Sequence, residues 1–135
     1  MGKSFMSLVV TTIMSAAAFA PAGAVTVTLV PLSSNSVAPA LTNAPCAVPN
    51  APAGISGAPF VEEPRIAEDM GATGTSGVVI SLRSSGALAS ESLMQTSGNT
   101  YLDGAALRSA RMTSFKAETI DCVPSAGTYL YSVEF

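Results

Sequence analysis

The strongest constraint on the fold lies in residues 97–115, which read SGNTYLDGAALRSARMTSF. The segment opens with a turn, because Gly98 adopts positive φ without strain and Asn99 tolerates it. Thr100 and Asp103 follow with the spacing of a capping box, in which a hydroxyl and a carboxylate satisfy amides of the first helical turn. The order predicts a tight turn followed at once by a helix.

The predicted helix carries a narrow stripe of mostly small side chains. At helical spacing the stripe contains Leu102, Ala105, Ala106, Ser109, Ala110 and Thr113. Arg108 and Arg111 fall outside the stripe. A helix with such small side chains can lie very close to a sheet.

Strand patterns lie on both sides of this helix. Residues 77–82 are rich in β-branched side chains and stop at a polar turn, Ser84-Ser85-Gly86, so they predict a hairpin whose second arm spans residues 87–95. Residues 128–135 alternate most clearly and place Tyr129, Tyr131, Val133 and Phe135 on one face. The predicted fold is α+β, a small three-stranded antiparallel sheet with one helix packed on it.

Taken together, these residues resemble the TonB C-terminal domain family over about half of the chain. The residues that carry the resemblance are Pro64, Ala67, Gly74, Gly86, Ser97, Gly98, Asn99, Leu102, Asp103, Ala105, Ala106 and Phe115. The chain departs from the family at Glu63, Thr113, Ser114 and Ala117. The resemblance implies the order β-β-α-β. It also implies that residues 64–75 form a short entry helix, which contains Ala67, and a turn at Gly74 that leads into the first strand.

The resemblance also implies a function. Members of the family are linked to energy transduction for transport across the outer membrane, and an edge of their sheet receives an extended segment of an outer-membrane transporter. We place this partner-binding edge on the final strand, at Tyr129, Leu130, Tyr131, Ser132, Val133, Glu134 and Phe135. Two alternatives stay open, which are a homodimer and a stand-alone secreted or periplasmic adaptor without a transducer role.

The N-terminal region predicts export. Residues 1–24 combine Lys3, an apolar stretch and small residues before Ala24, which is the pattern of a signal peptide cleaved after Ala24. Retention of the leader as an inner-membrane anchor is the competing interpretation. Residues 25–59 form a lead-in rich in Pro, Ala and Ser, within which residues 25–30 could add a strand, and residues 60–135 form the domain. The predicted location is the periplasm or the cell envelope.

The chain has two cysteines, Cys46 in the lead-in and Cys122 before the final strand. Export favours oxidation, so we expect one disulfide between them, worth about 4 kcal/mol in the chain-entropy model. A metal site is the rival interpretation. It lacks ligands, because the chain has no histidine.

Other residue patterns argue against catalysis. Without histidine the chain lacks the usual general base near neutral pH. The acidic pairs at residues 62–63 and 68–69 are typical of a solvated surface, and no spacing selects a serine to pair with Lys116. The sequence therefore predicts no catalytic, cofactor-binding or metal-binding residues. A small secreted enzyme is the least favoured alternative.

Net charge limits the class of partner. The chain carries 6 basic and 9 acidic residues, and loss of Lys3 with the leader leaves 5 against 9, a net charge of −4. Nucleic acid is therefore excluded as an expected partner, because its binding depends on clustered basic residues. We expect a protein partner.

Overall fold

The computed structural model describes residues 24–33 and 49–135. Most of the predicted leader, at residues 1–23, and Cys46 lie outside the described residues. Cleavage after Ala24 and the disulfide between Cys46 and Cys122 therefore stay predictions.

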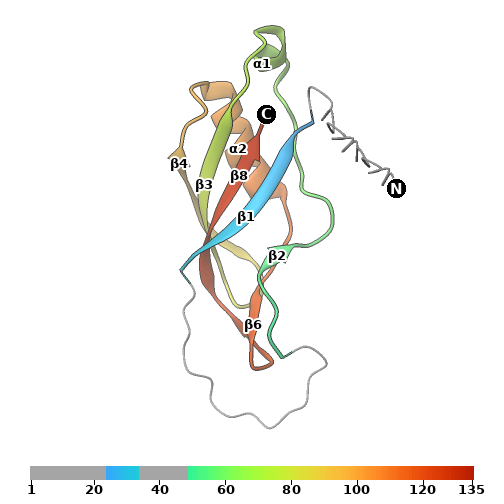
Figure 1. The fold of residues 1–135 in the computed structure, drawn as a ribbon, viewed down its shortest axis with the longest axis vertical. Helices are drawn as coiled ribbons and strands as arrows, with labels where there is room; N and C mark the ends of the chain where they lie inside the picture. The colour runs from blue at the N-terminus through green and yellow to red at the C-terminus, as the bar shows by residue number, and fades with distance from the viewer. Residues whose placement is uncertain (1–23, 34–48) are drawn as a thin grey trace, which may run out of the picture.

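The main sheet has four antiparallel strands in the order β1-β8-β3-β4 (Figure 1). The strands are β1 (Thr26–Ser33), β3 (Thr75–Leu82), β4 (Leu88–Gln95) and β8 (Gly127–Glu134). The predicted fold class is confirmed, although this sheet contains one strand more than expected. The additional strand is β1, which comes from the lead-in.

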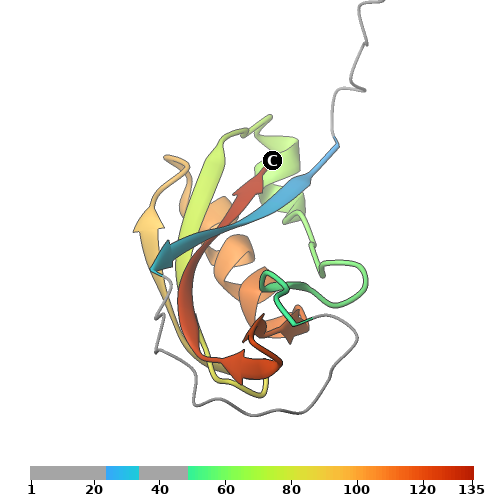
Figure 2. The same cartoon turned by 60° about the horizontal axis from the view of Figure 1, so that its bottom comes forward.

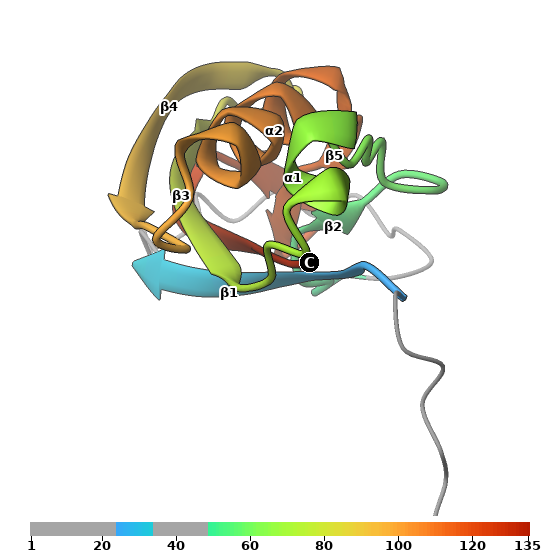
Figure 3. The ribbon, with the colours of Figure 1, turned by 90° about the horizontal axis from the view of Figure 1, so that it is seen from above.

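Helix α2 (Thr100–Met112) covers one face of the sheet, as the views in Figures 2 and 3 show. The predicted stripe of small side chains is buried, and Arg108 and Arg111 are exposed. Ala106 and Ala110 are fully buried in the central hydrophobic cluster, where their short side chains let the helix axis approach the strands.

The core lies between α2 and the inner face of the sheet. Strand β3 contributes alternate side chains to it, and so does β8 with Tyr129, Tyr131 and Val133, as the alternation predicted. Phe115 closes the core beyond the helix, with its ring perpendicular to that of Tyr131 at a centroid distance of 5.7 Å.

The hairpin between β3 and β4 has the predicted glycine turn. Gly86 has a φ of +85°, and a Cβ atom there would lie 2.6 Å from the carbonyl oxygen of Phe115. Only glycine fits both the conformation and the space. The turn therefore packs directly against the chain that leaves α2.

The start of α2 differs from the predicted capping box. Asn99 is the N-cap residue, and its side-chain oxygen accepts hydrogen bonds from the amides of Tyr101 and Leu102. Thr100 is already helical and its side chain is exposed. The prediction failed because Asn and Thr both favour the N-cap and only their backbone conformations decide between them.

Short elements complete the fold. Helix α1 (Arg65–Asp69) is the predicted helix before the first family strand, and it buries Ala67. Two small sheets pair β2 (Gly54–Ile55) with β5 (Phe115–Lys116), and β6 (Glu118–Ile120) with β7 (Val123–Ser125).

The prediction that the final strand is an edge was wrong. β8 lies inside the sheet, with β1 paired along one side of it and β3 along the other (Figure 1). The affected residues are Tyr129, Leu130, Tyr131, Ser132, Val133 and Glu134, while Phe135 lies just beyond the strand. The reason is that residues 25–30 have an apolar side of their own, which they bury by extending the sheet at this edge.

Candidate functional site

The side of β8 that was expected to be open is covered by β1. The register places Val27 opposite Val133 and Leu29 opposite Tyr131. The side chains of Val27 and Leu29 are half-buried against the core. β1 therefore pairs with the backbone of β8 along its open side, and its inward side chains cover one side of the core.

Side chains contribute little else to the attachment of β1. Among the described residues, no side-chain hydrogen bond or ion pair involves residues 26–32. Val30 and Leu32 remain 50% and 46% exposed. The attachment consists of the ladder to β8 and the half-buried aliphatic side chains.

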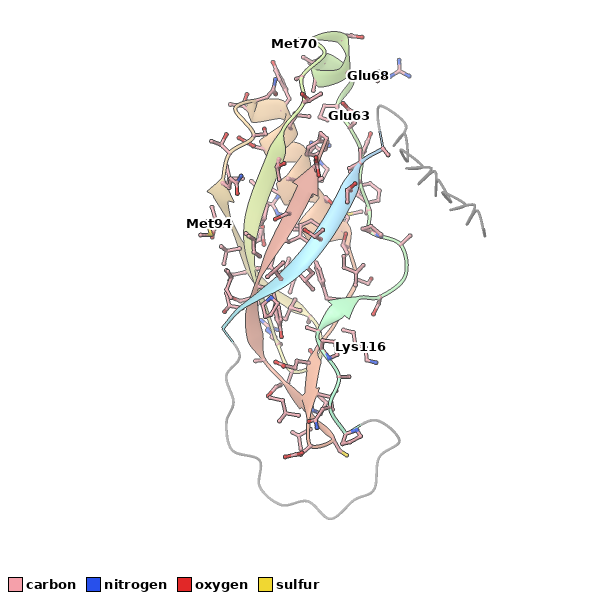
Figure 4. The ribbon with its side chains drawn as sticks, viewed as in Figure 1. Glu63, Glu68, Met70, Met94 and Lys116 are labelled. Carbon is pink, nitrogen blue, oxygen red and sulfur yellow. The ribbon has the colours of Figure 1, made fainter. Side chains whose placement is uncertain are left out.

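At the opposite margin, β4 is held to α2 by polar side chains. The Arg111 guanidinium donates a hydrogen bond to the Glu91 carboxylate and forms an ion pair with it. Just after β4, Thr96 and Ser97 donate hydrogen bonds to Asp103 near the start of α2. Figure 4 shows Met94 on the outer side of β4, where the side chain is 65% exposed.

Asp103 is the polar centre of this margin. Its carboxylate accepts a hydrogen bond from Ser76 Oγ at 2.7 Å and two from Ser97, from N and Oγ, each at 2.8 Å. Burial alone raises the pKa of Asp103, but the hydrogen bonds from Thr96, Ser97 and Ser76 outweigh it and hold that pKa below its ordinary value. Asp103 is therefore ionised at neutral pH, and its hydrogen bonds join α2 to β3 and to the residues that follow β4.

A second buried polar group joins β8 to α2. The hydroxyl of Tyr131 lies 2.6 Å from Ser109 Oγ and 3.1 Å from Thr113 Oγ1. Ser109 also donates to the carbonyl of Phe60, and Thr113 accepts from the Phe60 amide at 3.1 Å. The network fixes the chain before α1 against the end of α2, so Tyr131 is a packing residue and not an exposed contact for a partner.

Tyr129 behaves differently from Tyr131. Its hydroxyl is buried and lacks a hydrogen-bond partner among the described residues. Burial, and after it the charge of Glu118, raises the pKa of this hydroxyl. A Cβ atom at Gly127 would lie 2.6 Å from the Tyr129 hydroxyl, so the glycine makes room for the ring. Like Tyr131, Tyr129 is a buried core residue.

The residues considered for catalysis are dispersed. Figure 4 shows Glu63 just before α1 and Glu68 on α1, both well separated from Lys116 on β5. Lys116 lines an open depression of about 230 Å³ together with Ser56, Ser84, Ser85, Phe115, Ala117, Thr119 and Pro124. Within the described part of the chain, none of these serines forms a hydrogen bond with Lys116.

Residues 24–33 and 49–135 lack the features of a membrane span or of a metal site. They contain no helix of sufficient length and apolarity to cross a membrane. They also contain no group of three or more His, Cys, Asp or Glu side chains that could hold a metal ion. The candidate site is the margin of the sheet formed by β8 and its covering strand β1, where the two strands pair along their length.

Sequence reasoning missed the cover on β8 and the polar partners of Asp103 and Tyr131. A signal existed for the cover, since residues 25–30 alternate like a strand. The polar side chains of Ser109 and Thr113, spaced one helical turn apart in an otherwise apolar stripe, also indicated a buried polar partner on the sheet.

Comparison with known proteins identifies the family. Residues 64–135 match the family described as Gram-negative bacterial TonB protein C-terminal, whereas β1 and β2 precede the matched region. Comparisons with curated proteins and with solved structures gave no match. The matched region covers more than half of the chain and contains both α1 and α2, the hairpin and β8. The chain therefore belongs to the TonB C-terminal family, a family of protein-interaction domains of the cell envelope.

Proposed function

We propose that this protein binds an extended segment of another envelope protein by strand addition, in support of energy-dependent transport across the outer membrane. The observation that carries the proposal is the family match over the whole β3-β4-α2-β8 unit. Strand addition suits this unit, because backbone hydrogen bonds supply affinity at a sheet margin and alternate side chains supply specificity.

The unit is a firm platform for such binding. Asp103 and the network around Tyr131 tie the helix to the sheet at both ends of α2. A partner strand would therefore meet a rigid sheet, which reduces the entropy lost on binding.

A stand-alone adaptor without a transducer role is the second candidate, and the position of β1 favours it. Thr26 is the second residue after the predicted cleavage site, and it is already paired with Glu134. A leader retained as an anchor would hold the sheet against the membrane, with no spacer to reach across the periplasm. Release of the leader gives the domain freedom to reach a distant partner.

Photo-crosslinking in the native host tests strand addition. A photoreactive residue is introduced at Ser132 on the outward face of β8 or at Met94 on β4, and at exposed Asp69 on α1 as the matched control. We expect an outer-membrane protein, identified by mass spectrometry, in adducts from one sheet margin and not from Asp69. Absence of adducts from both margins would contradict the proposed function.

Fractionation separates the two candidates. A periplasmic product that begins at Val25 supports the adaptor. A full-length product in the inner membrane supports the first candidate, with the domain anchored by its leader and acting directly in energy transduction.

A further inference from the structure

We infer that β1 is a built-in substitute for the partner strand, and that a partner binds β8 by displacing β1 from it. The inference rests on the proposed function, because it specifies where strand addition occurs and what the added strand must look like. Its structural basis is that β1 lies outside the family match yet occupies one full side of the last family strand.

β1 has the properties of a strand that can leave. Within residues 24–33 and 49–135, its attachment lacks the polar side-chain contacts that hold β4, and its inward side chains are only half-buried. Segments with few buried contacts open locally at a lower free energy than the global unfolding of a domain. The β3–β8 pair and its contacts with α2 do not depend on β1, so β8 would remain folded with its side uncovered.

β1 also ends the sheet. Pro31 lies within the strand, and the register with β8 is irregular between Pro31 and Ser33. Proline and irregular pairing are features that prevent addition of a further strand at a sheet margin. Stacking a partner on the outside of β1 is therefore disfavoured, and exchange with β1 is the route that leads to β8.

The side of β8 that β1 covers determines which side chains a partner segment must carry. It requires aliphatic side chains at the positions of Val25, Val27 and Leu29, because these pack against the core. Between them it accepts small uncharged side chains, since Thr28 lies opposite Ser132. The partner is thus an extended segment in which aliphatic residues alternate with small polar ones.

Glu134 gives a partner one advantage over β1. It is exposed, and its neighbours across the two ladders are Thr26 and Thr75, neither of which is charged. A Lys or Arg at the position of Thr26 would place opposite charges directly across the strands, a favourable cross-strand pair. The structure thus favours a partner with a basic residue at this position.

A peptide-binding experiment on the full chain tests the exchange. The probe is a fluorescent peptide with the sequence of residues 25–33, VTVTLVPLS, and anisotropy gives its Kd. The double variant Val27→Asp with Leu29→Asp places two charges on the inward face of β1 and should expel it from the sheet. The matched control, Thr28→Asp with Val30→Asp, adds the same charge on the exposed face.

We expect the inward-face variant to bind the peptide at least about tenfold more tightly than the wild type, because removing a competing segment raises the competent fraction. The outward-face control should resemble the wild type. Equal affinity in both double variants, or no binding by a folded inward-face variant, would overturn the inference.

Two further measurements guard against misfolding and non-specific binding. If the inward-face variant does not fold, the single variant Leu29→Ala is used in its place. A peptide affinity of Leu29→Ala no higher than that of the wild type overturns the inference.

A peptide carrying Thr26→Lys should bind the inward-face variant about threefold more tightly than the original peptide, and adding Glu134→Gln to the protein should remove that gain. A gain that survives Glu134→Gln contradicts the assigned register.

A result that rules out the exchange of β1 can be told apart from one that rules out the proposed function. Crosslinks to an outer-membrane protein from Met94 alone, together with no peptide binding at β8, would place strand addition at β4. In that case the proposed function stands and the exchange of β1 is wrong.

Discussion

The two outer strands of the main sheet are attached to the domain in different ways. β4 belongs to the family-matched unit and is fixed to α2 through Asp103 and the Glu91–Arg111 ion pair. β1 precedes that unit and is held by its ladder to β8 and by half-buried aliphatic side chains. The difference indicates that β4 is a permanent part of the domain, whereas β1 is a removable cover.

The largest expected effect comes from removing the polar anchor of β4. Asp103→Ala leaves the Ser76 and Thr96 hydroxyls and the Ser97 amide without their acceptor, so we expect a loss of about 3 kcal/mol in the free energy of unfolding. Urea denaturation measures it. Asp69→Ala, an exposed acidic residue on α1, is the control and should change stability by less than about 0.5 kcal/mol. Similar losses in both variants would show that Asp103 is not an anchor.

The same anchor predicts a dependence on pH. Since the pKa of Asp103 is lower in the folded protein than in the unfolded chain, its stabilisation is complete above the ordinary aspartate pKa of about 3.9. This contribution is lost as the pH falls from that value through the lower folded pKa. The stability difference between the wild type and Asp103→Ala should therefore be constant near neutral pH and shrink below about pH 4. A difference that stays constant at low pH would refute the assigned ionisation.

On β1 the expected effect is smaller. Leu29→Ala removes a half-buried side chain, for which we expect a loss of about 1 kcal/mol, well below the cost at a fully buried site. Val30→Ala, at the neighbouring position on the exposed face, should be nearly neutral. Thermal or urea unfolding of the two variants compares the faces directly. If Val30→Ala costs as much as Leu29→Ala, the outer face of β1 is covered in solution.

The smallest expected effect concerns the surface ion pair on β4. Arg111→Ala breaks the contact with Glu91, and exposed ion pairs contribute no more than about 1 kcal/mol. A double-mutant cycle with Glu91→Gln gives the coupling energy, which should fall as salt is added. A coupling of several kcal/mol would mean that the ion pair, and not Asp103, dominates the attachment of β4.

Local sequence signals predicted the hairpin, α2 and the alternation of β8. Gly86 marked the turn, and the spacing from Leu102 to Thr113 marked the buried helix face. The neighbour of β8 could not be predicted in the same way, because alternation shows which face of a strand is buried but not which strand lies beside it. This is why the sequence alone indicates an edge at residues 129–135, even though residues 25–30 also show a strand pattern.

The polar anchors were beyond local patterns for a related reason. Ser76, Thr96 and Asp103 meet only when β3, β4 and α2 are assembled, so their spacing in the sequence carries no hydrogen-bond signal. Asp103 was expected to cap the helix and instead links three elements. The family resemblance predicted the β-β-α-β order of the domain. The pairing of β1 with the last family strand, β8, was visible only in the structure.

Native-state amide hydrogen exchange tests the detachable cover most directly. In a central antiparallel strand, some β8 amides donate to β1 and others to β3. The account predicts that the amides of β1 and those β8 amides bonded to β1 exchange together, at least about tenfold faster than the β8 amides bonded to β3. One common exchange rate for β1 and all of β8 would show that β1 opens only when the whole domain unfolds, and would contradict the account.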